Sequence, residues 1–194
     1  MTKHQFLNRF LIIGIFFTVS SCEPVYIPDP IDPRLPKYTD DGNDVGGAFI
    51  NGSLWRSEYF LSLFSGTNEP HLRYNATTDS LSINFEGKIG ESYRTISFGL
   101  KGYGIKSLQE MTKINGLLIH FDGVNNVATL DRLAVDFCPT TATGQIYFRS
   151  VKYNPENSFL TLSGTFGFNY DDPVCGNITV NYGRFDYSIY YFNQ

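Results

Sequence analysis

The chain has 194 residues, of which 18% are charged and 16% are aromatic, and its formal net charge at pH 7 is −4. This composition favours a packed, β-rich domain over a disordered chain, in which aromatic residues are scarce. The acidic balance and the lack of a cluster of Lys and Arg argue against nucleic acid and anionic lipid headgroups as partners, because both are bound by basic patches.

The first segment of the chain has the parts of a secretory signal. Lys3 and Arg9 form a basic start, residues 10–19 are an unbroken apolar run, and the four residues that end at Cys22 (VSSC) fit the lipobox pattern. The apolar run is shorter than the roughly 20 residues of a membrane-spanning helix, which indicates a cleaved signal over residues 1–21. The resemblance to bacterial lipoprotein signals implies that Cys22 carries several acyl chains, which together make a stable membrane anchor. The alternative is a secretory signal that happens to end beside a cysteine.

Residues 22–45 are predicted to be a tether that begins with the lipidated cysteine. Five of the nine prolines lie between Pro24 and Pro36, which blocks helix and sheet pairing and favours extended polyproline II. The Asp-rich stretch 40–44 resembles a calcium loop, but Val45 stands at a ligand position and no Glu follows at the twelfth. We therefore expect a solvated linker with no metal.

Residues 46–194 are predicted to be a single β domain, since about 150 residues suffice for one core. Apolar and polar residues alternate with period two, most clearly over 159–170 and 183–191, and turn signals separate such runs. Only 105–113 could form a helix, and a short one. The chain is therefore all-β: about nine or ten strands with one apolar face each must close into an antiparallel barrel or pair into a sandwich.

The last strand of this domain illustrates the alternation. Phe185, Tyr187 and Ile189 are expected on one face, whereas Arg184 and Asp186 are expected on the other. On a solvent-exposed face the last two would form a surface ion pair, which contributes little to stability.

Short motifs in the last third of the chain are recognisable. They lie at 144–148 (GQIYF), 162–168 (LSGTFGF) and 178–186 (ITVNYGRFD), and Asn51-Gly52 and Trp55 stand near the start of the domain. Together they resemble a family of uncharacterised cell-envelope lipoproteins of diderm bacteria with a small lipocalin-like barrel or sandwich. The resemblance implies no catalytic residues, since that family has no established chemistry. It implies no ligand-carrying lipocalin function either, because Trp55 does not stand at the Gly-x-Trp spacing of true lipocalins.

Cys138 and Cys175 are the even pair that remains once Cys22 is lipidated. In an oxidising envelope they are expected to form a disulfide. A loop of about 37 residues closed in this way is stabilised by on the order of 3–4 kcal/mol. Two buried free thiols are the alternative, and a zinc site is not indicated because no nearby His completes the spacing.

Catalytic patterns are sparse in the mature chain. His71 and His120 are too few for a multi-His metal site, and Asp122, which shares a strand face with His120, has no nucleophile motif to serve. We therefore expect no cofactor, no metal and no enzymatic activity. The alternative is a carbohydrate hydrolase that uses a carboxylate pair. Its candidate acids are Glu58, Glu86, Asp131 and Asp136.

Aromatic residues with polar edges are the compositional sign of ligand binding. Trp55 and Tyr59 are the candidate ligand contacts, because the run 51–60 (NGSLWRSEYF) mixes aromatic and charged residues without alternating. Broken alternation is expected at a strand edge or a barrel mouth. The alternative is packing, since Tyr, Trp and Phe are favoured in strands and fill barrel cores.

These patterns predict a lipid-anchored lipoprotein of the cell envelope that acts as a non-catalytic binding or structural module. Its partners would be the membrane, reached through the anchor, and a glycan, an apolar small molecule or another envelope protein, with no role for nucleic acid. Glu23 stands after Cys22 in place of the Asp associated with inner-membrane retention, which favours delivery to the outer membrane.

Overall fold

The computed structural model describes residues 32–57, 70–131, 142–172 and 176–190. These residues form ten strands and one short 3-10 helix, which confirms the predicted all-β fold with at most one short helix. The elements are β1 (Val45–Ile50), β2 (Ser53–Arg56), β3 (His71–Asn75), β4 (Ser80–Ile89), β5 (Ser92–Lys101), η1 (Gln109–Ile114), β6 (Leu118–Phe121), β7 (Asn126–Leu130), β8 (Thr143–Asn154), β9 (Phe159–Asp172) and β10 (Gly176–Ile189).

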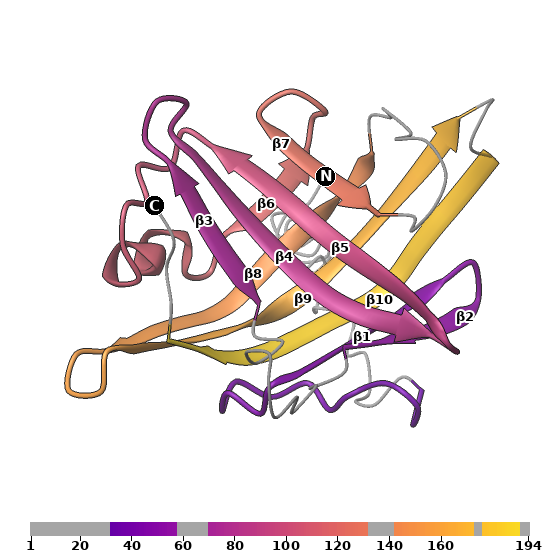
Figure 1. Ribbon diagram of the computed structural model, residues 1–194, viewed down its shortest axis with the longest axis horizontal. Coiled ribbons are helices and arrows are strands. Elements are labelled where there is room, and N and C mark those ends of the chain that lie inside the picture. Colours follow the sequence, from indigo (N-terminus) through magenta and orange to yellow (C-terminus); the bar gives the residue numbers. More distant parts are fainter. Residues whose placement is uncertain (1–31, 58–69, 132–141, 173–175, 191–194) are drawn as a thin grey trace, which may run out of the picture.

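All ten strands belong to one antiparallel sheet with the order β6-β8-β9-β10-β1-β2-β4-β5-β7, and β3 pairs with β4 beside β2. The sheet curls over, so that β3, β4, β5 and β7 cross in front of β8, β9 and β10 (Figure 1). Its two end strands, β6 and β7, are joined by a tight turn in which the amides of Asp122 and Gly123 donate to the carbonyl of Asn126. The sheet is therefore a nearly closed barrel, and the sandwich alternative does not apply.

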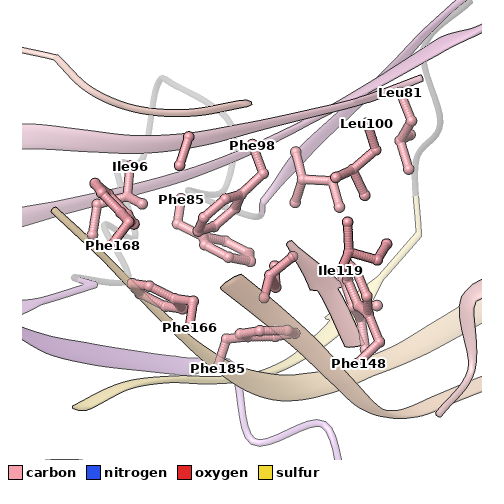
Figure 2. Packing of buried hydrophobic residues seen from close by; sticks show 14 of the residues in the cluster. Leu81, Phe85, Ile96, Phe98, Leu100, Ile119, Phe148, Phe166, Phe168 and Phe185 are labelled. Carbon is pink, nitrogen blue, oxygen red and sulfur yellow. The ribbon is translucent and has the colours of Figure 1, made fainter. Parts of the chain in front are cut away.

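Aromatic rings fill the middle of the barrel (Figure 2). The ring of Phe85 lies 5.2 Å from that of Phe185, and the ring of Phe98 lies 5.2 Å from Phe166 and 5.7 Å from Phe121. Such edge-to-face and offset pairs add stability beyond the apolar area that they bury. These side chains come from opposite walls, so the space between the walls is a packed core.

A bulge interrupts the alternation of β10. The pairing of β10 with β9 shifts register between Val180 and Gly183, and Tyr182 takes a positive φ of 53°. A side chain at Gly183 would meet the ring of Phe166, with a Cβ only 2.4 Å from Cδ2, so the close approach requires glycine here. The bulge leaves Tyr182 exposed on the outer surface.

Residues 32–44, which we call the strap, lie against the outside of the barrel. Leu35 is only 4% exposed, and a Cβ on Gly47 of β1 would come within 2.5 Å of Pro36. The expectation of a solvated linker is therefore wrong for these residues. β1 begins at Val45, beside the predicted domain start at residue 46, and the division of the chain into signal, tether and domain stays a prediction.

Candidate functional site

Polar side chains are buried beneath the strap. The part of the chain that the structure describes contains six buried polar or charged residues, and all of them lie on the outer faces of β8, β9 and β10. They are Ser150, Thr161, Ser163, Arg184, Asp186 and Ser188. The residues next to them in the chain point to the inner face and belong to the apolar core. Side chains on the outer face can be buried only if another segment covers them, and the strap is that segment.

Asp186 is the anchor point of the strap. Its side chain is 1% exposed, and its carboxylate accepts four hydrogen bonds from strap residues. One oxygen accepts the Gly42 amide at 2.8 Å; the other accepts the Thr39 hydroxyl, the Asn43 side-chain amide at 3.0 Å and the Asp41 amide at 3.3 Å. A buried carboxylate is tolerated only when it is hydrogen-bonded in this way.

Further bonds to the strap come from the neighbouring outer-face residues. Arg184 donates to the carbonyl of Pro36 at 3.1 Å, and the Ser188 amide donates to the carboxylate of Asp44 at 2.8 Å. The predicted surface ion pair of Arg184 and Asp186 is therefore wrong, because both side chains are buried and both bond to the strap.

Two exposed cations of β8 extend the contact. Lys152 forms a 2.7 Å salt bridge with Asp40, and this bond holds the pKa of the Asp40 carboxyl below its ordinary value. Arg149 donates to the carbonyl of Tyr38 at 3.0 Å, and its guanidinium lies 4.3 Å from the centre of the Tyr38 ring. Hydrogen bonds, charge and ring contacts thus all hold the strap on the sheet.

Asp44 ends the strap and stands close to Asp186. Burial raises the pKa of the Asp44 carboxyl above its ordinary value, the bond from the Ser188 amide opposes this rise, and the charge of Asp186 adds to it. The strap therefore holds two carboxylates near each other, one of them fully buried.

Trp55, the first of the two predicted ligand contacts, is a core residue. Its side chain is fully buried, and its indole N–H donates to the carbonyl of Arg94 at 3.0 Å. Gly87 on β4 leaves room for the ring, since a Cβ there would come within 2.5 Å of the indole. The expectation that Trp55 contacts ligand is thus corrected in favour of the packing alternative, because Trp55 and its cross-strand partner Ala48 both face the core. Tyr59, the second predicted contact, lies outside the described residues.

Several of the other predicted residues cannot be placed. Cys22, Cys138, Cys175, Glu58 and Asp136 all lie outside the part of the chain that the structure describes. Lipidation and the disulfide therefore stay predictions.

Glu86 and Asp131 are the two candidate acids within the described residues. Glu86 lies opposite Thr95 across the pair β4–β5, and the Asp131 amide donates to the Thr95 carbonyl from the end of β7. Two strand spacings of about 4.8 Å separate them. Both acids lie on the outer face of the barrel wall, opposite the face that packs into the core.

His71 and His120 lie on separate strands, β3 and β6, and both are exposed. The Nε2 atom of His71 is 3.9 Å from the Glu86 carboxylate. Within the residues that the structure describes, no three His, Cys, Asp or Glu side chains gather as metal ligands would, and no helix has the length and apolar character needed to cross a membrane.

Asp122 caps its own turn and is not an orienting partner for His120. One carboxylate oxygen accepts the amides of Val124, Asn125 and Asn126 at 2.8–2.9 Å. These bonds, led by that of Asn126, hold the pKa of Asp122 at about 2. The carboxylate thus serves the β6–β7 turn that nearly closes the barrel.

A surface cavity of about 260 Å³ opens where the strap begins. The strap lines it with Pro33, Arg34, Leu35 and Pro36. The barrel lines it with Val45 and Gly46 of β1, Arg56 of β2 and Ser57, the residue after β2. Arg56 donates to the Arg34 carbonyl at 2.8 Å, so this bond ties β2 to the strap at the cavity.

Sequence reasoning missed both the anchor point at Asp186 and this cavity. The signals available were Leu35 and Tyr38, an aliphatic and an aromatic residue within a segment otherwise rich in Pro and Asp.

No known protein family, curated protein or solved structure matches this chain.

Proposed function

We propose that the chain is a cell-envelope lipoprotein, anchored in the outer membrane through Cys22, whose barrel is a non-catalytic binding or structural module. The signal and lipobox pattern of the sequence support the anchor. The observation that carries the proposal is the docking of the strap on Asp186, because it determines how the barrel is held on that anchor.

Asp32, where the strap begins, lies only ten positions after Cys22. At the rise of about 3.1 Å per residue of polyproline II, ten positions would span about 31 Å. A tether that stayed free as far as Val45 would span about 70 Å at the same rise. Docking of the strap thus roughly halves the distance that the anchor permits between barrel and membrane.

The packed interior directs binding to the outside of the barrel. Rings from opposite walls are in contact at its centre, so a glycan, an apolar small molecule or a partner protein would bind at the outer surface or at a loop. The hydrolase alternative gains no support from Glu86 and Asp131, which lie exposed on the outer wall.

The anchor is tested by intact-mass analysis of protein purified from membranes. The expected chain begins at Cys22 and carries acyl groups on that residue. Replacing Cys22 by Ser should release a folded domain from the membrane fraction, whereas the control Ser20→Ala keeps a small lipobox residue and should leave the protein anchored. A wild-type chain that is soluble or begins elsewhere would overturn the proposal.

A further inference from the structure

The cavity at the start of the strap brings together two arginines that are far apart in the sequence. Arg34 comes from the strap and Arg56 ends β2, 22 positions later. The acidic sequence, without a cluster of basic residues, gave no sign of this pair.

Both guanidinium groups are held in place. Arg34 forms two hydrogen bonds with the carboxylate of Asp32, at 2.9 and 2.7 Å, and its guanidinium lies 4.8 Å from the centre of the Phe49 ring. One guanidinium nitrogen of Arg56 donates a hydrogen bond to the carbonyl of Arg34, and Arg56 forms no salt bridge with any described residue.

The described residues that line the cavity include two arginines and no acid. Its bonds with Arg34 hold the pKa of Asp32 at about 2, so Asp32 stays ionised and balances Arg34. Among the described residues, no acid is within ion-pair distance of Arg56. The hydroxyl of Ser57 adds a neutral polar group, and prolines with Leu35 and Val45 supply an apolar wall.

We propose that this cavity binds a phosphate group, held chiefly by Arg56 with Arg34 beside it. A planar guanidinium matches phosphate oxygens with two parallel hydrogen bonds. A volume of about 260 Å³ suits a headgroup-sized ligand, below the range of drug-sized pockets.

The phosphate has two possible sources, a lipid headgroup or a phosphate free in solution. The lipid source rests on the proposed membrane anchor, because ten positions from Cys22 to Asp32 would allow a distance of about 31 Å between the start of the strap and the bilayer at the rise of polyproline II. The free-phosphate source does not depend on that anchor.

The first arm of the test uses the full mature protein in neutral detergent, titrated with inorganic phosphate and followed by calorimetry. Arg56→Gln should weaken binding about tenfold, the effect of losing one charge-assisted contact. Arg56→Lys should weaken it less, because the charge stays and the fork is lost. The control Arg73→Gln removes an exposed arginine of β3, away from the cavity, and should bind as the wild type does. An unchanged melting temperature shows that each variant is folded.

The second arm places the same proteins in vesicles of phosphatidylglycerol or phosphatidylcholine and measures amide exchange at Val45 and Gly46. Both lipids carry a phosphate, so a headgroup site should slow exchange in both relative to detergent, and Arg56→Gln should abolish the slowing. Binding in this arm alone identifies a lipid source, and binding in the first arm identifies a free phosphate. No binding in either arm, or equal weakening by Arg56→Gln and Arg73→Gln, overturns the proposal. Loss of the lipid arm through a missing acyl anchor would show separately, in the mass analysis of Cys22.

Discussion

Replacing Asp186 by Ala should release the strap from the barrel. The substitution removes four hydrogen bonds to a buried carboxylate, made by Thr39, Asp41, Gly42 and Asn43. Bonds to charged groups contribute about 1.5–3 kcal/mol each, so the gross loss is about 6–12 kcal/mol.

The measured loss should be smaller than this sum, because the strap can leave and its donors can bond to water. Ordering of the backbone costs about 1–2 kcal/mol per residue, so the docking of about thirteen residues is a small net balance of large opposing contributions. The gross loss of about 6–12 kcal/mol is larger than a net docking free energy of a few kcal/mol. The strap should therefore undock while the ring-filled core stays folded.

Two measurements follow the strap directly. Amide exchange over residues 39–44 should become fast in Asp186→Ala, and trypsin should cut after Lys37 at a greatly increased rate. The melting temperature of the barrel should fall by only several degrees, at about 2–4 °C per kcal/mol for a domain of this size. Asp131→Ala is the control, since it removes an exposed aspartate on the opposite wall. Unchanged exchange over residues 39–44 in Asp186→Ala would refute the role of Asp186 as anchor point.

Four further outcomes are expected. Trp55→Ala should lower the free energy of unfolding by about 3–5 kcal/mol in denaturant titration, the usual cost of a lost core aromatic; a loss below 1 kcal/mol would contradict its burial. The raised pKa of Asp44 means that this group contributes most to the free energy of unfolding at low pH, and that the contribution is lost as the pH rises through the folded-state pKa. Asp44→Asn should therefore raise the melting temperature at pH 7, and this gain should vanish near pH 3. The lowered pKa of Asp122 has the opposite effect: its contribution to the free energy of unfolding is present above the ordinary pKa of 3.8 and is lost as the pH falls towards 2. Asp122→Ala should speed amide exchange in the β6–β7 turn at pH 7 far more than Asp122→Asn, which keeps an oxygen that can accept the turn amides. Equal effects of the two substitutions would contradict the role of Asp122 as a cap. If Cys138 and Cys175 are bonded, alkylation of the denatured, unreduced protein should label neither, whereas labelling of both would show free thiols.

The sequence was sufficient to predict the class of fold and most of the core. Alternation of period two placed Leu81, Ile83 and Phe85 on one face and Phe185 and Tyr187 on another, and all five are buried. This works because a strand's period is local: each residue's face follows from its neighbours alone. A short helix was likewise expected within 105–113, and η1 (Gln109–Ile114) overlaps that range and ends one residue beyond it.

Tertiary structure decided which outward-facing residues are exposed. Nothing in the alternation of β10 distinguishes Asp186, which is 1% exposed, from an ordinary surface acid, because its cover comes from a strap more than 140 positions earlier in the chain. In the same way the irregular run 51–60 suggested an exposed Trp55, whereas pairing with β1 and β4 turns this residue into the core. Periodicity reports the two faces of a strand, but only the long-range pairing of strands and strap determines what lies over each face.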